Sequence, residues 1–296
     1  MEFRTPVKLA KAPLVLTPES RVVMLGSCFA EAVGEHMREL LPEENVALNP
    51  FGVLYNPESV RMALELLLFD SFFFPNEYIF QGQDGLWHSW LHSTHFSSEK
   101  REECVRRTRL ERDRAAQILR EADLLCVTFG TNRAFEHRER GFVVGNCHKE
   151  LPQTFVERRL GVAEIVASWE GILQELARIN PKIRVLFTVS PYRYAGYGLH
   201  ESQLAKAVLL LAVDELCERV TIADYFPAYE IILDELRDYR FFAPDMLHPS
   251  AQASDYVWET FAAWTFTSDL HRHERETKKK LKAARHRSNV EKKKKN

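Results

Sequence analysis

Four apolar runs along the chain are continuous rather than alternating, which is typical of strands buried on both faces of a parallel sheet. They are RVVMLG (21–26), DLLCVTFG (123–130), KIRVLFTVS (182–190) and RVTIADY (219–225). Segments with helical spacing lie between and around them, at 28–41, 57–69, 99–122, 162–179, 201–218, 228–239 and 251–266. This alternation predicts an α/β fold with a doubly wound parallel sheet and helices on both faces.

Two segments, 70–98 and 133–160, do not fit this alternation and are rich in aromatic residues, His and Asn. Long insertions inside compact domains are often functional. We expect each insertion to contain a hairpin.

The composition indicates a soluble protein of a reducing compartment. With 296 residues, 45% of them hydrophobic, the chain can fill one large core or two smaller ones. The 5 cysteines are an odd number without short regular spacing, so neither a disulfide framework nor a zinc knuckle is indicated. The most apolar run, 64–74, is too short to span a bilayer and contains two acidic residues. We expect a cytoplasmic protein with no membrane span.

The net charge of −2 conceals a basic end, because residues 271–296 contain 12 Lys and Arg but only 3 Glu. We therefore expect a globular domain over 1–270 and a solvated, disordered tail over 271–296. A basic block of this kind can also bind RNA or anionic lipid. No aromatic residues are interleaved to stack on bases, so nucleic acid is not the expected partner.

The first apolar run ends in a glycine, a serine and a cysteine, and a helix follows at once, in VVMLGSCFAEAVGEHM (22–37). Ligands of open parallel sheets bind at the carboxyl ends of the strands, and helix N-termini stabilise developing anions. Ser27 therefore occupies a workable position for a nucleophile. Strand-Gly-Ser-helix turns are also common without any catalytic role, so this segment alone leaves both interpretations open.

Asp245 and His248, in PDMLHPS (244–250), precede the last predicted helix. An Asp-x-x-His turn lets the carboxylate accept the Nδ1–H of the same imidazole, which leaves Nε2 free to act as a general base. Proline and serine in this segment also fit an ordinary helix start. The two roles are compatible.

Two further polar signals lie between these ends. NPFG (49–52) follows the first predicted helix, and its Gly52 permits a close backbone approach to a ligand. FGTN (129–132) places Asn132 at the same edge of the sheet as Ser27. An Asn amide and backbone N–H groups that converge form an oxyanion hole, although each segment alone is a common turn signal.

A series of motifs occurs in order along the chain: GSCFA (26–30), NPFGVLYNP, GLWHSW, TFGTN, NCHK, SPYR and YFPAYEIILDELRDYRFFAPDMLHPS. Together they resemble the GSCFA family, a branch similar to the SGNH hydrolases. The resemblance runs from about residue 3 to residue 266 and leaves the basic tail outside. It implies a flavodoxin-like three-layer α/β/α sandwich with a parallel sheet and a serine hydrolase site.

The resemblance also assigns roles to single residues. Ser27 is the expected nucleophile, with its own backbone N–H as one oxyanion donor. Gly52 is expected to supply a second N–H, and Asn132 the side-chain donor. Asp245 and His248 are the expected acid and base of the triad. The implied site uses no metal and no cofactor.

In this pattern the nucleophile directly follows the glycine, so Ser27 is preferred, and Cys28 is expected to begin the helix and point elsewhere. The expected activity is hydrolysis of a small-molecule, glycan or lipid ester through an acyl-enzyme, as an esterase or deacylase. A sugar hydroxyl or an amine as acceptor would make the protein an acyltransferase. A ligand-binding protein on the hydrolase fold is the non-catalytic alternative. A platform for a sugar ring, or a wall for an acyl group, is expected from Trp87, Trp90, Phe96 and Tyr194.

A metalloprotein is the other alternative, because His88, His92 and His95 crowd one insertion and Cys147 and His148 the other. The HxxxH spacing can present two imidazoles to one ion, but the aromatic surroundings equally fit a pocket lid. We expect these side chains to support the structure or contact substrate rather than bind a metal.

Overall fold

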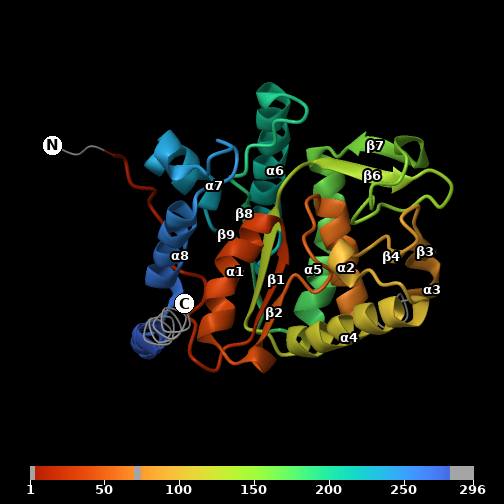
Figure 1. Ribbon diagram of the computed structural model, residues 1–296. Coiled ribbons are helices and arrows are strands. Elements are labelled where there is room, and N and C mark those ends of the chain that lie inside the picture. The colour runs from red at the N-terminus through yellow and green to blue at the C-terminus, as the bar shows by residue number, and fades with distance from the viewer. Residues whose placement is uncertain (1–3, 70–74, 281–296) are drawn as a thin grey trace, which may run out of the picture.

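The computed structural model describes residues 4–69 and 75–280, and its centre is a parallel sheet (Figure 1). The strand order is β2-β1-β5-β8-β9, and every neighbouring pair is parallel. This is the 2-1-3-4-5 order of flavodoxin-like folds. The strands are β1 Val22–Gly26, β2 Val46–Leu48, β5 Leu124–Phe129, β8 Arg184–Val189 and β9 Ala223–Tyr225.

The predicted doubly wound fold is thus confirmed, with one strand more than the apolar runs indicated. The four runs correspond to β1, β5, β8 and β9, although β9 is only the second half of its run. The additional strand, β2, has 3 residues and lies at the edge of the sheet beside β1. A segment this short has no detectable hydrophobic period, so the pattern could not reveal it.

Helices cover both faces of the sheet, because alternate residues of each strand point to opposite sides. Val23 and Leu25 of β1 belong to a core shared with α2, α4, α5 and α6. Val22 and Met24 belong to a second core shared with α1, α7 (Ala228–Glu230) and α8 (Figure 1). The long helices are α1 Cys28–Leu40, α2 Pro57–Leu68, α4 Arg101–Arg120, α5 Val162–Ile179, α6 Leu199–Arg219 and α8 Ala251–Thr265.

The single helix predicted over 228–239 is the main point at which the helices of the structure differ from the prediction. The chain forms α7 over Ala228–Glu230, a π-helix over Ile231–Leu236 and a 3-10 turn over Tyr239–Phe241. Ile231 and Ile232 are both fully buried although they are adjacent. The wider π-turn ends at Arg237, which has a left-handed φ of 41° and donates its N–H to the Ile232 carbonyl.

Both insertions contain the hairpin expected of them. β3 Ile79–Gln81 pairs with β4 Trp87–Ser89, and β6 Arg133–His137 pairs with β7 Phe155–Arg159. The short helix α3 spans Pro75–Tyr78, and single 3-10 turns occupy Glu43–Asn45, Thr94–Phe96 and Pro152–Thr154. Residues 70–74 of the first insertion lie outside the described residues.

The predicted boundary between domain and tail at residue 270 stays a prediction. Residues 268–280 are helical, and His273 Nε2 lies 3.1 Å from the Leu40 carbonyl oxygen. The rest of the predicted tail, 281–296, lies outside the described residues. Over the described ranges, no helix combines the length and apolarity that a membrane crossing requires.

We predict that Gly26→Ala destabilises the protein by about 3–5 kcal/mol, because this position has a φ of +136° and a Cβ atom would lie 2.2 Å from the Thr128 carbonyl oxygen. Urea unfolding measures the loss. Gly171→Ala is the matched control, since a Cβ atom there meets nothing within 4 Å. In the interior of α5 this second change should add about 0.5–1 kcal/mol of stability. Equal unfolding midpoints for the two variants would contradict the prediction.

Candidate active site

The carboxyl end of β1 passes very close to β5. Only glycine allows this approach, because the Cβ atom of any other residue at position 26 would lie 2.2 Å from the Thr128 carbonyl oxygen. The Gly26 N–H donates to Asn49 Oδ1 at 2.9 Å, and the Gly26 carbonyl accepts the Leu54 N–H at 2.8 Å. The chain therefore turns from β1 into α1 on a fixed path, which sets the backbone of Ser27.

Ser27 is the N-cap residue of α1, but its hydroxyl does not cap the helix. Serine at this position usually accepts an N–H of the first turn. Here the residue is 1% exposed, and its Oγ has no hydrogen-bond partner among the residues described. A buried hydroxyl without a partner costs stability. A structural role therefore does not explain this side chain.

Asp245 and His248 form the pair that the sequence predicted. Asp245 Oδ2 lies 2.5 Å from His248 Nδ1, while Oδ1 accepts the backbone N–H groups of Leu247 and His248 at 2.9 and 3.0 Å. The hydrogen bond with His248 is the main cause that lowers the pKa of Asp245 to about 2. The Tyr192 ring stacks on the imidazole, with a centroid distance of 4.1 Å. Carboxylate and aromatic ring together fix the orientation of His248.

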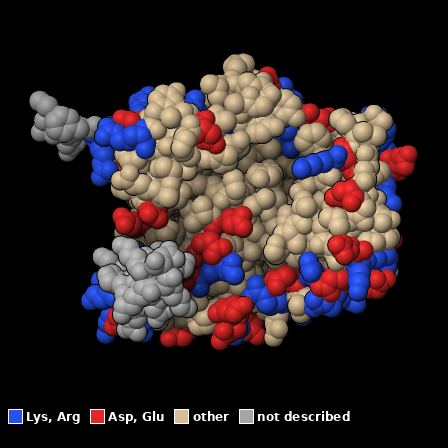
Figure 2. Space-filling view, viewed as in Figure 1, with Lys and Arg blue, Asp and Glu red and all other residues tan. Residues whose placement is uncertain are grey.

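Ser27 and His248 line one cavity of about 320 Å³, although no hydrogen bond joins them in this structure. The wall combines the start of α1, the turns after β5 and β8, the start of α2, the second insertion and the turn that holds His248. In Figure 2 the hollowed centre of the visible face is mostly uncharged, whereas charged side chains gather over α4. The arrangement can place a nucleophile and a base on one bound molecule.

The three oxyanion donors expected from the resemblance are already bonded within the chain. The Ser27 N–H donates to the Thr128 carbonyl at 3.2 Å, and the Gly52 N–H donates to the Asn49 carbonyl at 2.7 Å. The Asn132 amide donates to the Leu160 carbonyl at 2.9 Å. Neither Gly52 nor Asn132 is among the residues that line the cavity. Because an amide nitrogen carries two hydrogens, the bond to Leu160 uses only one of those of Asn132, and both assignments stay predictions.

The expectation that Cys28 points away from the site is wrong, since Cys28 begins α1 but lines the same cavity as Ser27. Burial raises the pKa of its thiol, which lowers the fraction of reactive thiolate. Cys28 is therefore present at the site without the electrostatic activation of a cysteine nucleophile.

The aromatic wall of the cavity is built from tyrosines rather than from the tryptophans considered above. Trp90 and Phe96 are buried, and neither they nor Trp87 line the cavity, whereas Tyr194 does. Three further tyrosines, which sequence reasoning missed, line the cavity together with Tyr194: Tyr55, Tyr192 and Tyr197. The spacing YRYAGY after a buried strand was the available signal for the last two.

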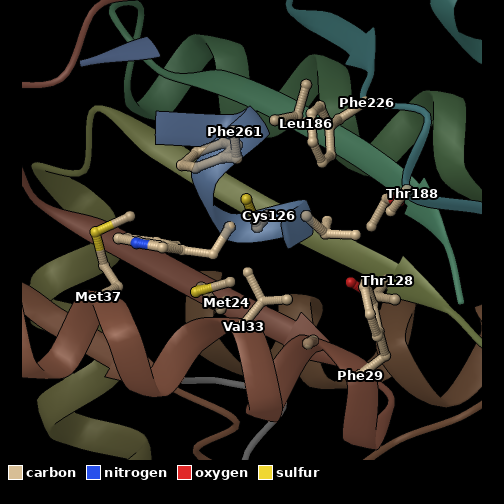
Figure 3. Close-up of a pocket in the computed structure, with 14 residues that line it drawn as sticks. Met24, Phe29, Val33, Met37, Cys126, Thr128, Leu186, Thr188, Phe226 and Phe261 are labelled. Carbon is tan, nitrogen blue, oxygen red and sulfur yellow. The ribbon is translucent and has the colours of Figure 1, made fainter. Parts of the chain in front are cut away.

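A second cavity, of about 30 Å³, lies between the sheet and helices α1 and α8 (Figure 3). Its wall is almost wholly apolar, with Met24, Val33 and Cys126 among the side chains that surround it. This volume holds about one or two waters. Only the larger cavity has the size and the polar groups of a substrate site.

The sequence model of the GSCFA family matches residues 21–261, a range that contains all the residues of this site. The chain belongs to the GSCFA family. No curated protein matches its sequence.

Two solved structures are similar to this GSCFA protein. One is an acetyl xylan esterase (Est2A) from the rumen bacterium Butyrivibrio proteoclasticus, with 10% identity, a TM-score of 0.41, and coverage of 84% of this chain and 64% of that chain. The other is a family two carbohydrate esterase from Clostridium thermocellum in complex with cellohexaose, with 12% identity, a TM-score of 0.38, and coverage of 86% and 66%. The GSCFA chain spans slightly less than two thirds of the first of these esterases.

Three histidines of the two insertions bond to oxygen atoms inside the GSCFA protein. His88 contacts Ser97 Oγ and Asp84 Oδ1 at 2.6 and 2.9 Å, and His92 Nδ1 lies 2.7 Å from Ser89 Oγ. His148 Nε2 lies 2.8 Å from the Ser89 carbonyl oxygen. His95 is exposed. Over residues 4–69 and 75–280 no group of three or more His, Cys, Asp or Glu side chains is arranged to hold a metal ion.

Lys206 of α6 is a buried cation next to the site. It is 3% exposed, and its Nζ donates to the Gly130 carbonyl at 2.5 Å. Gly130 itself lines the cavity. Burial lowers the pKa of Lys206 to about 7, and the nearby Cys28 thiol opposes this shift. The folded chain therefore favours the neutral amine over a wide pH range.

We predict that the stability of Lys206→Met relative to wild type is highest below pH 7 and declines as the pH rises. Between the folded-state pKa of about 7 and the ordinary value of 10.5, the unfolded chain binds one more proton at Lys206 than the folded chain. The cost of the buried cation is thus complete below pH 7 and disappears toward pH 10.5. Urea unfolding at about pH 6, 8 and 9.5 measures this difference.

Lys8→Met is the control for this experiment, because Lys8 is exposed and far less subject to desolvation. The free energy of unfolding of Lys8→Met should differ from that of wild type by the same amount at each pH. A difference for Lys206→Met that does not change with pH would contradict the prediction.

Proposed function

We propose that this GSCFA protein is a serine hydrolase that cleaves esters through an acyl-enzyme. One observation supports this most: Ser27, with a buried and unpartnered hydroxyl, lines the same cavity as His248, whose Nδ1 is held by Asp245. The serine stands at the N-terminus of α1, where helix N–H groups favour a developing negative charge. These are the parts that a Ser-His-Asp mechanism needs.

In the proposed reaction, Ser27 Oγ attacks the ester carbonyl and His248 Nε2 takes the hydroxyl proton. The tetrahedral oxyanion then collapses, the bond to the leaving alcohol breaks, and His248 returns its proton to that alcohol. Water attacks the acyl-enzyme in the second half, again with His248 as base, and releases the acid. Because the pKa of Asp245 is about 2, its carboxylate stays ionised at neutral pH and stabilises the imidazolium.

Proton transfer requires His248 Nε2 within about 3 Å of Ser27 Oγ, a contact that is often loose before substrate binds. The side chain of His248 is 46% exposed and sits on a turn in which Met246 has a left-handed φ of 59°. The proposed mechanism therefore requires that these two atoms come within this distance when substrate is bound.

The proposed substrate is the ester of an acylated carbohydrate. Tyr55 and Tyr194 are each 41% exposed and Tyr197 is 37% exposed, which leaves aromatic faces open around the cavity. Burial raises the pKa of Tyr55 to about 12, so its hydroxyl remains protonated. Aromatic faces with hydroxyl groups at their rims suit a sugar ring, which has apolar C–H faces and polar edges.

We predict that a fluorophosphonate probe labels wild-type protein and Cys28→Ala but neither Ser27→Ala nor His248→Ala. The probe reacts only with a serine hydroxyl that a neighbouring base activates. Intact mass measures the covalent adduct. Asp245→Asn should label about 10³–10⁴-fold more slowly, because it removes the carboxylate that fixes the imidazole tautomer.

Labelling lost in Cys28→Ala but kept in Ser27→Ala would transfer the nucleophile role to the thiol. No adduct on wild type, together with intact ester recovered after long incubation, would favour a ligand-binding protein. Addition of a sugar acceptor tests acyl transfer, since an acyltransferase would yield the acylated acceptor in place of the free acid.

We predict that Tyr194→Ala raises KM about 10-fold for an acetylated oligosaccharide and leaves hydrolysis of p-nitrophenyl acetate within about 2-fold of wild type. The large ester needs the aromatic face, whereas the small one needs only the reacting groups. Steady-state kinetics with both esters measures the difference. Tyr239→Ala is the control, because Tyr239 is 62% exposed and does not line the cavity. An equal loss with both esters would contradict binding of sugar by this ring.

A further inference from the structure

Asn56 lies at the start of α2, on a loop that is bonded to the strand of the candidate nucleophile. The Asn49 N–H donates to the Met24 carbonyl at 2.9 Å, and the Leu54 N–H donates to the Gly26 carbonyl at 2.8 Å. The next carbonyl, of Tyr55, accepts two N–H groups from the turn after β5, at 2.7 and 2.9 Å. These bonds hold the backbone before Asn56 between the ends of β1 and β5.

Helix capping fixes which side of the Asn56 amide remains available. Its Oδ1 accepts the Ser59 N–H at 2.8 Å, as an N-cap residue does, and Pro57 occupies the first helical position. The oxygen of the amide is therefore committed. The nitrogen is left with two hydrogens to donate.

The Asn56 nitrogen has no hydrogen-bond partner within residues 4–69 and 75–280, yet it is not enclosed. The residue is only 6% exposed and lines the cavity together with Ser27. By contrast, the Nδ2 of Asn49 is both unpartnered and fully enclosed. Asn56 thus lines the cavity with a donor that its cap bond holds in place, whereas one N–H of the Asn132 amide donates to the Leu160 carbonyl.

We propose that Asn56 is the side-chain donor of the oxyanion hole, a role that rests on the proposed function of Ser27 as the acylated nucleophile. Its Nδ2–H donates to the carbonyl oxygen of the ester as that oxygen becomes negative. The N–H groups at the first turn of α1, which have no acceptor within the helix, complete the hole. The cap bond to Ser59 orients the amide before substrate arrives, so no reorganisation is needed during the reaction.

Asn56→Ser tests the proposal, because a serine hydroxyl at an N-cap still accepts the Ser59 N–H but has no amide to donate. We expect kcat for p-nitrophenyl acetate to fall about 10²–10³-fold, with KM and the urea unfolding midpoint close to wild type. Asn56→Asp keeps the shape of the side chain and the cap oxygen but has no amide hydrogens, and its kcat should fall by at least the same factor. A merely structural role would move the unfolding midpoint and not kcat alone.

Asn132→Ala tests the rival donor, at the position that the family resemblance favours. It should lower the unfolding midpoint, since it removes a buried hydrogen bond, and leave kcat of the folded enzyme within about 3-fold of wild type. Asn56→Ser with wild-type kcat, or a 10²-fold loss of kcat in Asn132→Ala alone, would overturn the proposal while Ser27→Ala remains inactive. If Ser27→Ala instead hydrolyses the ester as fast as wild type, the proposed function itself fails, and the role of Asn56 fails with it.

Discussion

The contact between Gly26 and the Thr128 carbonyl is the constraint on which the site depends. A Cβ atom would lie 2.2 Å from that oxygen, so the ends of β1 and β5 can meet only because position 26 has none. This approach brings the start of α1, the turn after β5 and the loop before α2 to one edge of the sheet. If the strands separated here, Ser27 and Asn56 would no longer line the same cavity.

The chemistry of the cavity comes from hydrogen-bonding capacity that the fold leaves unused. Ser27 occupies a capping position without capping its helix, so its hydroxyl is free. Asn56 does cap its helix, but a carboxamide has both an acceptor and a donor, and only the acceptor is used. The Gly52 N–H and one N–H of the Asn132 amide instead donate to the carbonyls of Asn49 and Leu160. Residue type alone therefore does not identify a catalytic donor.

Sequence reasoning succeeded where the deciding interactions are local. Continuous apolar runs predicted β1, β5 and β8, and the spacing of Asp245 and His248 predicted a bond that forms within one turn. It could not foresee contacts that depend on a remote partner. Nothing near Asn132 in the sequence indicates that the carbonyl of Leu160 will accept its amide. Cys28 was misplaced for a similar reason, because the neighbours that make the cavity come from other segments.

The first insertion supports the second, and the second contributes to the wall of the cavity. The Trp90 carbonyl accepts the N–H groups of Gly145 and Asn146 at 2.7 and 3.2 Å, and the Ser89 carbonyl contacts His148. The first insertion thus holds the second, and the second supplies part of the cavity wall. This explains why the histidines and tryptophans of the first insertion are mostly buried. Substitutions in the wall can alter the ligand without moving Ser27 or His248, which stand on other elements.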